Sequence, residues 1–414
     1  MRILFLSQYY PPETGAPQNR LSGLARELSV QGHQVEVLTA MPNYPAMEVH
    51  SSYKRRWFVR ENLEGISVNR SWIYVSKNRS VFSRLLNYFS FTISALLVSS
   101  RLPKRFDVVL CESPPLFLGI SGWWIARRKR ALFVFNVSDL WPESAEKLGV
   151  IRNRFFLQAA TKLEEWLYRK SSFITGQTQG ICTDIRRRNP DKTVHWLPNG
   201  VDRALLNAPV GSDWRKRAGY SDTDFLILYA GIIGIAQGLD TVLDAAKRLP
   251  AESHVRFLLL GEGPEKVRLM NRKQKEEINH VEFPESVKRE GMPDVIHSVD
   301  AAVIPLKKMD LFLGAIPSKI FENLALGKPI ILGVDGEARN LFIHQKPCGI
   351  YVEPENPEQL VLAAEELANN PQRCIELGKN GKALVEEKFL RSSIATDFAA
   401  VAAEHLSKTV KSNP

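Results

Sequence analysis

The chain has 414 residues, of which 44% are hydrophobic and 24% charged, and its 55 Lys and Arg against 45 Asp and Glu give a formal net charge of +10. This composition excludes a disordered or fibrous chain, and the length predicts two domains of ordinary size. The basic excess favours an anionic partner such as a phosphorylated substrate, a membrane surface or a nucleic acid, although solubility alone would explain it equally well.

The ends and the cysteines give no sign of export. Ser7 and Gln8 interrupt the apolar start MRILFLSQYY, so it does not read as a signal peptide. No stretch reaches the roughly 18 apolar residues of a membrane span. The four cysteines have neither CxxC spacing nor a histidine partner, which is typical of reduced residues in a cytosolic protein. We therefore expect a cytoplasmic protein.

The first forty residues predict a strand–helix–strand unit. Its parts are a buried strand at 3–6, a turn-rich loop at 10–18, an amphipathic helix at 19–31 and a strand at 35–40. The loop falls at the carboxyl edge of a parallel sheet, where open α/β sheets bind ligands. Gly15 and Ala16 would let the backbone approach a phosphate or an acceptor closely. Arg20 would either reach an anionic group there or lie on a solvated helix face.

The segment 85–98, LLNYFSFTISALLV, is apolar around nearly its whole circumference but too short to span a membrane. Its flanks are basic, with Arg79, Arg84, Arg101, Lys104 and Arg105. Two interpretations remain open: a helix inside the core, or a helix whose apolar side sits in the membrane interface with its basic flanks on lipid headgroups. A basic-aromatic run at 54–60 and a basic run at 127–130 would support the second.

Further strands complete the first domain, at 107–110, 132–137, 173–176 and 193–197, with helices at 118–127 and 154–170. The strand 132–137 leads into a loop that carries Asp139. Its carboxylate would either cap the turn before Trp141 and Pro142 or face a substrate at the sheet edge.

A second series of strands and helices follows a polar linker near 206–213. Its strands are predicted at 225–230, 254–260, 281–283, 301–305, 330–332 and 349–352, with a glycine-rich loop at 231–238 and long amphipathic helices from about 358 to 409. Two such series predict two doubly wound Rossmann-like domains facing across a cleft. We place them at 1–205 and 206–389, with the last helix, about 390–414, crossing back to the first.

The stretch 311–331, LFLGAIPSKIFENLALGKPII, is the strongest candidate site. Pro317 and Ser318 suit the start of a helix that ends at Gly327, and strand–loop–helix order puts this start at the carboxyl edge. Lys319 and Glu322 then share one helical face. The cation could meet a diphosphate and the carboxylate could accept hydrogen bonds from a ribose. The alternative is an ordinary surface pair.

With these elements placed, the chain resembles the retaining glycosyltransferases of family 4, which have the GT-B fold. The resemblance runs from end to end, through PPETGAPQNR, LPNGVD at 197–202, AGIIGIAQGLDTVLDA at 230–245, LLGEGPE at 259–265 and PSKIFENLALGKPII at 317–331. The loop FNVSDLWPES and the PSK variant are similar to those of bacterial O-antigen and capsule enzymes that transfer N-acetyl-L-fucosamine or related amino sugars.

The resemblance implies roles for particular positions. Glu322 matches the second Glu of the family's E-x7-E motif, which binds the donor ribose, whereas the first Glu falls at Gly314. The family's basic pair falls at Ile232 and Gln237, beside Gly234, and neither residue is basic. The nearest substitutes for the missing diphosphate contacts are Lys319, Arg268 and the amides of Gly314, Ala315 and Ile316 next to Ser318. Asp139 matches a family position on the first-domain side of the site.

The resemblance thus implies a UDP-sugar donor, a polyprenyl-diphosphate-linked acceptor and peripheral attachment to the inner face of the cell membrane. No metal spacing of histidines or Asp-x-Asp loop occurs, so we expect neither a metal nor another cofactor, and no nucleic-acid-binding motif accompanies the charge. Two alternatives remain: a GT-B-fold UDP-sugar epimerase, and a GT-B-like binding subunit without catalysis.

Overall fold

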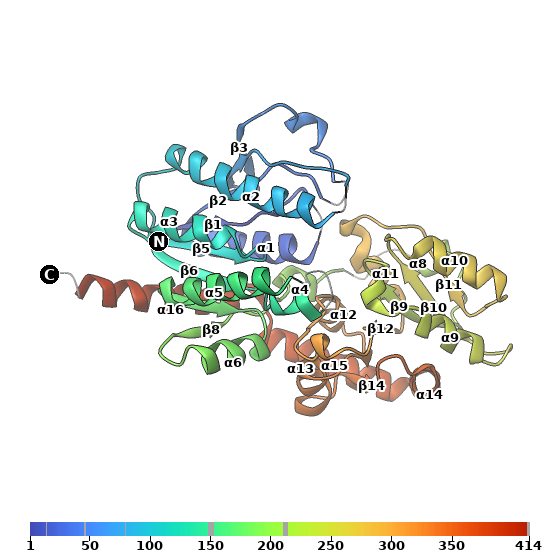
Figure 1. The fold of residues 1–414 in the computed structure, drawn as a ribbon. Coiled ribbons are helices and arrows are strands. Elements are labelled where there is room, and N and C mark those ends of the chain that lie inside the picture. Colours follow the sequence, from blue (N-terminus) through green and yellow to red (C-terminus); the bar gives the residue numbers. More distant parts are fainter. Residues whose placement is uncertain (14, 45–46, 79, 148–152, 210–213, 412–414) are drawn as a thin grey trace. The chain divides into compact units, whose positions relative to one another are not determined.

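The computed structural model describes residues 1–13, 15–44, 47–78, 80–147, 153–209 and 214–411, and these form two compact units (Figure 1). Unit 1 comprises Met1–Asn199 with Arg391–Pro414, and unit 2 comprises Gly200–Leu390. The chain therefore passes into unit 2 within LPNGVD and returns for its last helix. Residues 210–213 of the predicted linker, and Arg79 in the predicted basic flank, lie outside the described residues.

Unit 1 is built on an eight-stranded sheet with the order β3-β4-β2-β1-β5-β6-β7-β8. Neighbouring strands are parallel except β3 and β4, which pair antiparallel at one edge. The strands are β1 (Arg2–Leu6), β2 (Gln34–Ala40), β3 (Phe58–Leu63), β4 (Ile66–Ser71), β5 (Val108–Ser113), β6 (Leu132–Val137), β7 (Phe173–Gly176) and β8 (Val194–Trp196).

Helices cover both faces of this sheet, because side chains on successive strand residues point to opposite faces. Leu4 and Leu6 face α2, α3, α5 and α6, whereas Ile3 and Phe5 face α1 and α16. The helices are α1 (Ala16–Val30), α2 (Val81–Val98), α3 (Leu118–Lys129), α4 (Glu143–Lys147), α5 (Arg154–Lys170), α6 (Gln179–Arg188) and α16 (Arg391–Lys411), with short 3-10 turns η1 (Ser51–Tyr53) and η2 (Ser99–Arg101).

Unit 2 contains a six-stranded, entirely parallel sheet with the order β11-β10-β9-β12-β13-β14. Its strands are β9 (Phe225–Ala230), β10 (Val255–Leu260), β11 (Val281–Glu282), β12 (Ala301–Pro305), β13 (Ile330–Gly333) and β14 (Gly349–Tyr351). The two predicted Rossmann-like sheets are therefore confirmed.

The helices of unit 2 again lie on both faces of its sheet, with α9, α10, α14 and α15 on one and α8 and α11 on the other. The helices are α7 (Arg203–Leu206), α8 (Trp214–Arg217), α9 (Asp240–Arg248), α10 (Lys266–Lys275), α11 (Met292–Ser298), α12 (Lys319–Ala325), α13 (Glu337–Arg339), α14 (Pro357–Asn369) and α15 (Pro371–Lys388), with 3-10 turns η3 (Ile235–Gln237), η4 (Arg289–Gly291) and η5 (Asp310–Phe312) and a π-helical turn η6 (Asn340–Gln345). Within the described ranges, no helix combines the length and hydropathy needed to cross a bilayer.

The hairpin of β3 and β4 is the main element that the sequence did not predict. A two-residue turn at Glu64 and Gly65 joins the strands, and both residues have positive φ, 51° and 84°. This conformation matches the twist of a tight hairpin. The strand β3 lies at the sheet edge, half-exposed, and its sequence FVRENL has no sustained apolar alternation, so the usual strand signal is weak.

The last helix, α16, belongs to unit 1, as the sequence predicted. Its buried residues Ile394, Ala395, Phe398 and Ala402 join the hydrophobic core beneath α1 and the sheet. The ring of Phe398 lies 6.2 Å from that of Phe173 on β7. The helix therefore contributes one whole buried face to the core of unit 1, although all of unit 2 lies between them in the sequence.

We predict that Phe398→Ala destabilises unit 1 by about 3–5 kcal/mol, because a fully buried ring is lost and a cavity remains. Urea unfolding followed by tryptophan fluorescence would measure this, since seven of the eight tryptophans lie at or before Trp196. Lys408→Ala, at an exposed position of the same helix, should change the midpoint little. Equal effects of the two variants would mean that α16 does not stabilise unit 1.

Candidate functional site

Polar side chains gather at the carboxyl end of the unit 2 sheet, where the loop after β12 leads into α12. The helix begins at Lys319, two residues later than the predicted start, and Ser318 makes no side-chain capping bond. Gly327, with φ 72°, follows its end. Because α12 has only seven residues, its macrodipole is a minor source of attraction for an anion. The side chain of Lys319 is the principal one.

Lys319 reaches across to the loop that follows β9. Its Nζ lies 3.5 Å from the centroid of the Tyr229 ring, a cation–π arrangement. A Cβ on Gly231 would lie 3.1 Å from the same nitrogen. The Tyr229 hydroxyl donates to the carbonyl oxygen of Ile232 at 2.5 Å, which fixes the ring. Lys319 is thus a half-buried cation at the glycine loop, not the alternative surface pair.

Burial lowers the pKa of Lys319 to about 7, and the nearby carboxylate of Glu322 opposes part of this shift. A buried ammonium loses hydration that one aromatic face and one carboxylate do not fully replace. Binding of a further anion would therefore raise the pKa of Lys319 and favour its protonated form. A diphosphate would be such an anion.

Two glycines hold the loops after β9 and β10 together. A Cβ on Gly261 would lie 1.8 Å from the carbonyl oxygen of Gly231, and one on Gly263 would lie 2.2 Å from that of Ile233. The Ile233 amide also donates to the Glu262 carbonyl at 2.9 Å. Any larger residue at Gly261 or Gly263 would force these loops apart, so the GEGPE turn supports the site without contributing a charge.

The structure places the remaining predicted donor residues around these loops. Gly234 is buried, and a Cβ there would lie 2.8 Å from Oε1 of Gln237, so the two are neighbours. Ile232 is 53% exposed and presents an apolar side chain where the family has a cation. Lys319 supplies the cation that the loop itself lacks.

Two predicted diphosphate contacts need correction. The amide of Ala315 already donates to the Phe312 carbonyl at 2.9 Å, so Gly314, Ala315 and Ile316 do not offer three available amides. Arg268 donates two hydrogen bonds to Asp240, at 3.0 and 2.5 Å, and one to Glu265 at 2.7 Å. A diphosphate would have to displace those carboxylates to bind Arg268. The sequence could not show the Asp240 partner, because it lies on another helix, α9, whereas Phe312 and Glu265 are local partners three residues away in sequence.

In unit 1, Asp139 follows β6 at the carboxyl edge of the sheet. Its Oδ2 accepts a hydrogen bond from Ser144 Oγ at 2.7 Å. Burial raises the pKa of Asp139 above its ordinary value, and Glu143 adds to this rise, whereas the Ser144 hydrogen bond opposes it. The carboxyl group is only half-buried, so it orders the turn through Ser144 and still presents a surface to solvent.

Arg20 is buried in unit 1 and paired with a carboxylate of the same unit. It is only 5% exposed, and its guanidinium forms a buried ion pair with Glu112 on β5 and donates to Gln177 Oε1 at 3.1 Å. The predicted solvated helix face is therefore wrong, and the anionic group that Arg20 reaches within the chain is the carboxylate of Glu112. The pair anchors α1 to the carboxyl ends of three strands, since Ser138 after β6 joins it.

This anchoring network was not predicted. Asn136 donates to Glu112 and accepts from Thr175 Oγ1 at 2.7 Å. The available signal was the polar residue near the end of each otherwise apolar strand, in VVLCES and LFVFNV. The network sits beside the start of α1, whose first residue is Ala16. Gly15 precedes α1, and a Cβ on it would lie 2.5 Å from Oε1 of Gln18, which makes the turn tight.

Glu13 in the same loop was also missed. Its carboxylate accepts hydrogen bonds from the backbone amides of Asn43 and Tyr44, both at 2.8 Å, and from Tyr10 at 3.3 Å. Burial raises the pKa of Glu13, and these amide donors oppose the rise. Glu13 thus ties the loop after β1 to the segment after β2.

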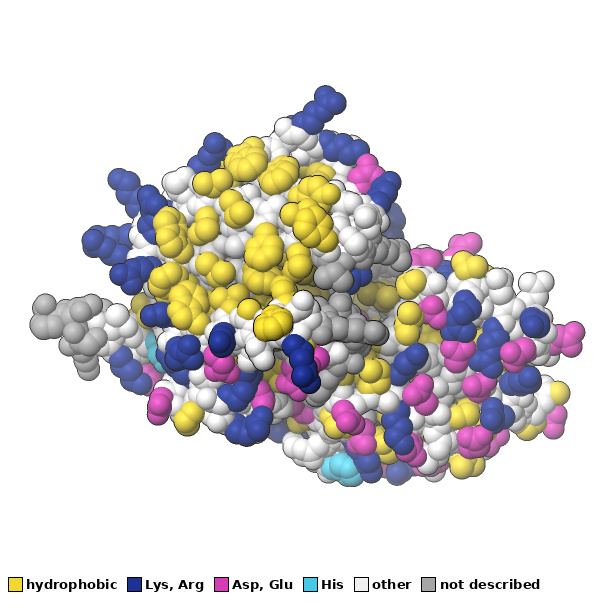
Figure 2. All heavy atoms as spheres, in the orientation of Figure 1, with side chains coloured by type: hydrophobic (Ala, Val, Ile, Leu, Met, Phe, Trp, Pro, Cys, Tyr) yellow, Lys and Arg dark blue, Asp and Glu magenta, His cyan; other side chains and the backbone are white. Residues whose placement is uncertain are grey.

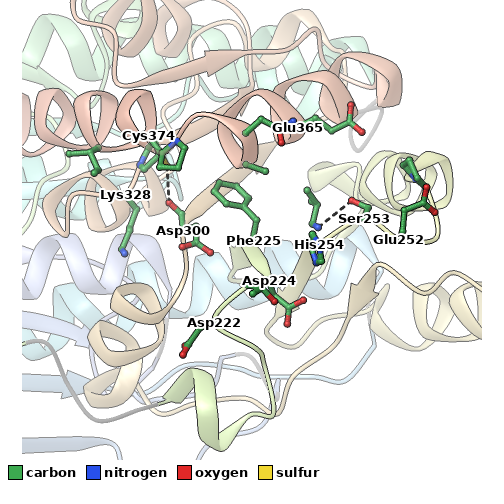
Figure 3. Close-up of a pocket in the computed structure, with 18 of the residues that line it drawn as sticks. Asp222, Asp224, Phe225, Glu252, Ser253, His254, Asp300, Lys328, Glu365 and Cys374 are labelled. Atoms are coloured by element: carbon green, nitrogen blue, oxygen red, sulfur yellow. Dashed lines mark hydrogen bonds between the residues drawn. The ribbon is translucent and has the colours of Figure 1, made fainter.

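A cavity of about 590 Å³ lies at the opposite, amino edge of the unit 2 sheet (Figure 3). Asp224, Asp300, Glu252 and Glu365 line it together with Lys328 and Cys374. Its central carboxylates have structural partners, because Asp300 accepts from Arg215 at 3.2 Å and from the Leu226 amide at 2.8 Å. Since parallel sheets bind ligands at the carboxyl edge, we do not place the active site here. Among the described residues, no group of three or more His, Cys, Asp or Glu is arranged to hold a metal.

Two family models together cover most of the chain. The model of the "Glycosyl transferase 4-like domain" matches residues 15–200, and that of "Glycosyl transferases group 1" matches residues 212–384. The matches coincide with the sheets of units 1 and 2, each carrying its site loops at the carboxyl edge. The chain is a glycosyltransferase of the GT-B type. The resemblance to family 4 is confirmed at this level, and that to amino-sugar transferases stays a prediction.

Two curated relatives cover nearly the whole of this glycosyltransferase. WcaI of Escherichia coli K12, whose name assigns it to colanic acid biosynthesis as a glycosyl transferase, is 27% identical over 87% of this chain and 90% of its own. The O-antigen chain mannosyltransferase C of Escherichia coli is 25% identical over 94% of each chain. The glycosyltransferase is therefore homologous to enzymes of surface polysaccharide synthesis.

Solved structures share the fold over the full length. Sucrose-phosphate synthase of Thermosynechococcus elongatus has a TM-score of 0.76 at 15% identity, covering 98% of this chain and 99% of its own. HepE of Anabaena, in complex with UDP and glucose, has a TM-score of 0.72 at 16% identity, covering 98% and 100%.

We predict that the Lys319 amine titrates near pH 7, because burial lowers its pKa to about 7. Acylation by limiting acetic anhydride at several pH values, read by mass spectrometry, would give its midpoint, since only the neutral amine reacts. Lys308 is the matched control, because hydrogen bonding to Glu353 raises its pKa above 10.5. Glu322→Gln should lower the Lys319 midpoint further. A Lys319 midpoint close to that of Lys308 would contradict the buried placement.

Proposed function

We propose that this glycosyltransferase is a retaining enzyme that moves a sugar from a UDP-sugar to a polyprenyl-diphosphate-linked glycan in bacterial surface polysaccharide synthesis. The observation that carries the proposal is the placement of Lys319 and Glu322 at the carboxyl edge of unit 2, against the Gly231 loop. N-acetyl-L-fucosamine is the sugar that the FNVSDLWPES and PSK stretches favour.

Lys319 and Glu322 divide the recognition of the nucleotide between them. Lys319, beside the glycine loop, would bind the diphosphate and regain the proton that burial disfavours. Glu322 lies one helical turn further along α12 and would accept two hydrogen bonds from the ribose hydroxyls. HepE, which shares the fold, is known with UDP and with UDP-glucose, and this supports a uridine nucleotide as the donor.

Asp139 is the catalytic candidate in unit 1. An ionised carboxylate there would stabilise the positive charge that develops on the sugar as the bond to the diphosphate breaks. The leaving diphosphate oxygen would take the proton of the acceptor hydroxyl on the same face. Configuration at the sugar is then retained without a nucleophile from the protein. This route requires neither a metal nor another cofactor.

The acceptor is proposed to be lipid-linked because α2 is apolar on its outward side. Phe82, Leu86, Phe89, Ile93 and Leu97 form a stripe whose members are 39–71% exposed, whereas Ser83, Asn87 and Ser94 on the inward side are buried. Figure 2 shows hydrophobic side chains gathered over this face of unit 1, with Lys and Arg at its margin. Neither predicted interpretation was complete: α2 contributes Phe91, Ala95 and Val98 to the core and still leaves a stripe in solvent.

Exposed basic residues surround this stripe, namely Arg84, Arg101, Lys104, Arg105, Arg127 and Arg128. Lys129 does not belong to them, because it is buried and donates to the Leu102 carbonyl at 3.1 Å. Each exposed cation near an anionic membrane is worth about 1 kcal/mol. An apolar stripe with a basic margin suits reversible attachment to the inner face of the cell membrane.

The decisive experiment is a panel of nucleotide-sugars with polyprenyl-diphosphate-GlcNAc as acceptor, read by mass spectrometry. UDP-activated amino sugars should give a transferred product, and EDTA should not abolish it. The panel must include GDP-mannose as a donor, because one relative is a mannosyltransferase. Transfer from GDP-mannose alone would refute the UDP assignment, and donor epimerisation without transfer would refute the transferase.

We predict a crossed pattern of binding losses for two variants. Glu322→Gln should weaken both uridine and UDP, by about 1.5–3 kcal/mol, because the ribose contacts are common to the two ligands. Lys319→Met should weaken UDP alone, because only UDP carries the diphosphate. Calorimetry with both ligands would measure this. Equal losses for uridine and UDP in Lys319→Met would remove Lys319 from the diphosphate site.

We predict that Asp139→Asn lowers kcat about 10²-fold while UDP affinity is kept, as expected of a group that acts in the transition state. Because burial raises the pKa of Asp139, wild-type activity should fall with acid as the carboxylate is protonated, at a pH above its ordinary 3.8. The activity of Asp139→Asn should not show this fall at low pH. In Ser144→Ala, which lacks the hydrogen bond to the carboxylate, the fall in activity should begin at a higher pH. A normal kcat in Asp139→Asn would leave Asp139 with only its turn-forming role.

A further inference from the structure

A second cavity, of about 460 Å³, opens in unit 1 beyond the ends of β2 and β4. Met41 follows β2 and Trp72 follows β4, and both line it. Because β2 and β4 are parallel, the cavity lies at the same carboxyl edge as Asp139. Its lining also includes Val49, Tyr53, Lys54, Arg55, Arg56, Tyr74 and Lys77. It is a mixed cavity, with apolar and aromatic walls and a basic rim.

The wall of the cavity at Trp72 and Tyr74 is bonded to α2, the helix that carries the apolar stripe. The segment that lines it at Trp72 and Tyr74 runs along the helix: Asn87 Nδ2 donates to the Tyr74 carbonyl at 2.6 Å, and the Tyr74 amide donates to Ser90 Oγ at 2.9 Å. Ser94 donates to the Trp72 carbonyl. The polar inward side of α2 is thus used to hold this wall. A molecule with a polar head in the cavity could lay an apolar tail along the stripe.

The charges in the cavity select an anion with more than one negative charge. Four cations and one carboxylate line it. Lys54 and Lys77 both contact that carboxylate, Glu48, at 2.7 and 3.2 Å. Arg55 and Arg56 are exposed, and neither has an ion pair with any residue that the structure describes. Two guanidinium groups that line one cavity suit the oxygens of a diphosphate.

The backbone beside the arginines is held in a rare conformation. Arg55 has φ 60° and Met47 has φ 51°, so two non-glycine residues of the cavity lie in the left-handed region. Long side chains seldom adopt this conformation, and it persists where the surroundings impose it. The 3-10 turn η1 precedes Arg55, and the Arg56 amide donates back to the Tyr53 carbonyl at 3.3 Å. The loop is folded so that both arginines stand at the cavity.

We propose that this cavity binds the diphosphate of the lipid-linked acceptor, with the isoprenoid chain lying along the α2 stripe. The inference rests on the proposed function, which it deepens by assigning a place to the acceptor. Trp72 and Tyr74, with Trp57 stacked on Trp72 at 5.5 Å, provide flat apolar walls beside the arginines. Such walls suit the first isoprene units or a sugar ring better than they suit a free inorganic anion.

The order of strands adds a restriction on the acceptor. The cavity lies over β2, and Asp139 follows β6, three strands away in the sheet. At about 4.8 Å per strand, this is roughly 15 Å. A diphosphate in the cavity would therefore stand well apart from the group at Asp139. The reacting hydroxyl then belongs to a glycan already attached to the lipid, and the enzyme extends a chain and does not start one.

Direct binding tests the proposal without requiring turnover. Farnesyl diphosphate, farnesol and inorganic diphosphate would be titrated calorimetrically against the wild type and against Arg55→Gly/Arg56→Ala. Glycine suits φ 60° and keeps the fold. Farnesyl diphosphate should bind tightest, and the double variant should weaken it at least tenfold. Lys319→Met, which changes the diphosphate contact proposed for unit 2, is the matched control and should leave this affinity unchanged.

Each contrary result has a distinct meaning. Inorganic diphosphate binding as tightly as farnesyl diphosphate would show an anion site without a lipid and overturn the proposal. So would farnesyl diphosphate affinity that the double variant leaves intact. If the double variant loses flotation with phosphatidylglycerol vesicles as fully as Arg84→Glu/Arg101→Glu but keeps farnesyl diphosphate affinity, the arginines only attach the protein to bulk phospholipid. Failure of the nucleotide-sugar panel with farnesyl diphosphate binding intact would refute the proposed donor chemistry and leave this site standing.

Discussion

Parallel pairing is the constraint on which both halves of this glycosyltransferase depend. When neighbouring strands run in the same direction, every loop that follows a strand emerges at one edge of the sheet. In unit 2 this brings Tyr229 and Gly231, two residues apart at the end of β9, against Lys319 after β12. In unit 1 it places the loop after β1, the segment after β2 and Asp139 after β6 along one edge of the sheet. Residues far apart in sequence come to one edge because the strands before them are aligned, and contacts such as those of Gly261 and Glu13 then hold the loops in place.

The same constraint explains how much of the fold could be predicted. Buried parallel strands are short apolar runs between turn residues, so β1, β6, β9 and β12 are plain in the sequence, and the α5 range was predicted at 154–170, where the helix is observed. The hairpin of β3 and β4 escaped because an edge strand is half solvated and its charged residues break the alternation. Helix starts were less certain than helix centres. The first turn of α12 is closed by backbone bonds to Pro317 and Ser318, and a capping side chain, which a sequence would have shown, is absent from it.

For the candidate site, sequence reasoning placed a residue correctly where its position depends on its own helix and misplaced it where its setting depends on a distant partner. Lys319 and Glu322 share a face because of helical spacing alone. Arg20 was expected to reach an anionic group or to lie on a solvated helix face, and Arg268 was expected to contact a diphosphate. Both are paired with carboxylates on other elements, Glu112 for the first and Asp240 for the second. A guanidinium pairs with a carboxylate that lies close to it in the folded chain. The separation of Arg20 and Glu112 in the sequence does not predict that contact. Tyr229 was missed for the same reason.

The departure from the family pattern at Ile232, Gln237 and Gly314 has one physical consequence that follows from Lys319. A pair of exposed cations on the glycine loop would be charged at all physiological pH values and would repel each other in the absence of a ligand. A single amine buried over the Tyr229 ring avoids that repulsion, because it can release its proton when the site is empty; burial lowers its pKa to about 7. Its charge is then restored by the anion that binds. The attraction between Lys319 and a diphosphate is therefore coupled to uptake of a proton above pH 7, and it weakens as the pH rises, because a larger part of the binding free energy is spent on protonating the amine. In this arrangement the bound diphosphate stabilises the positive charge on Lys319 that attracts it.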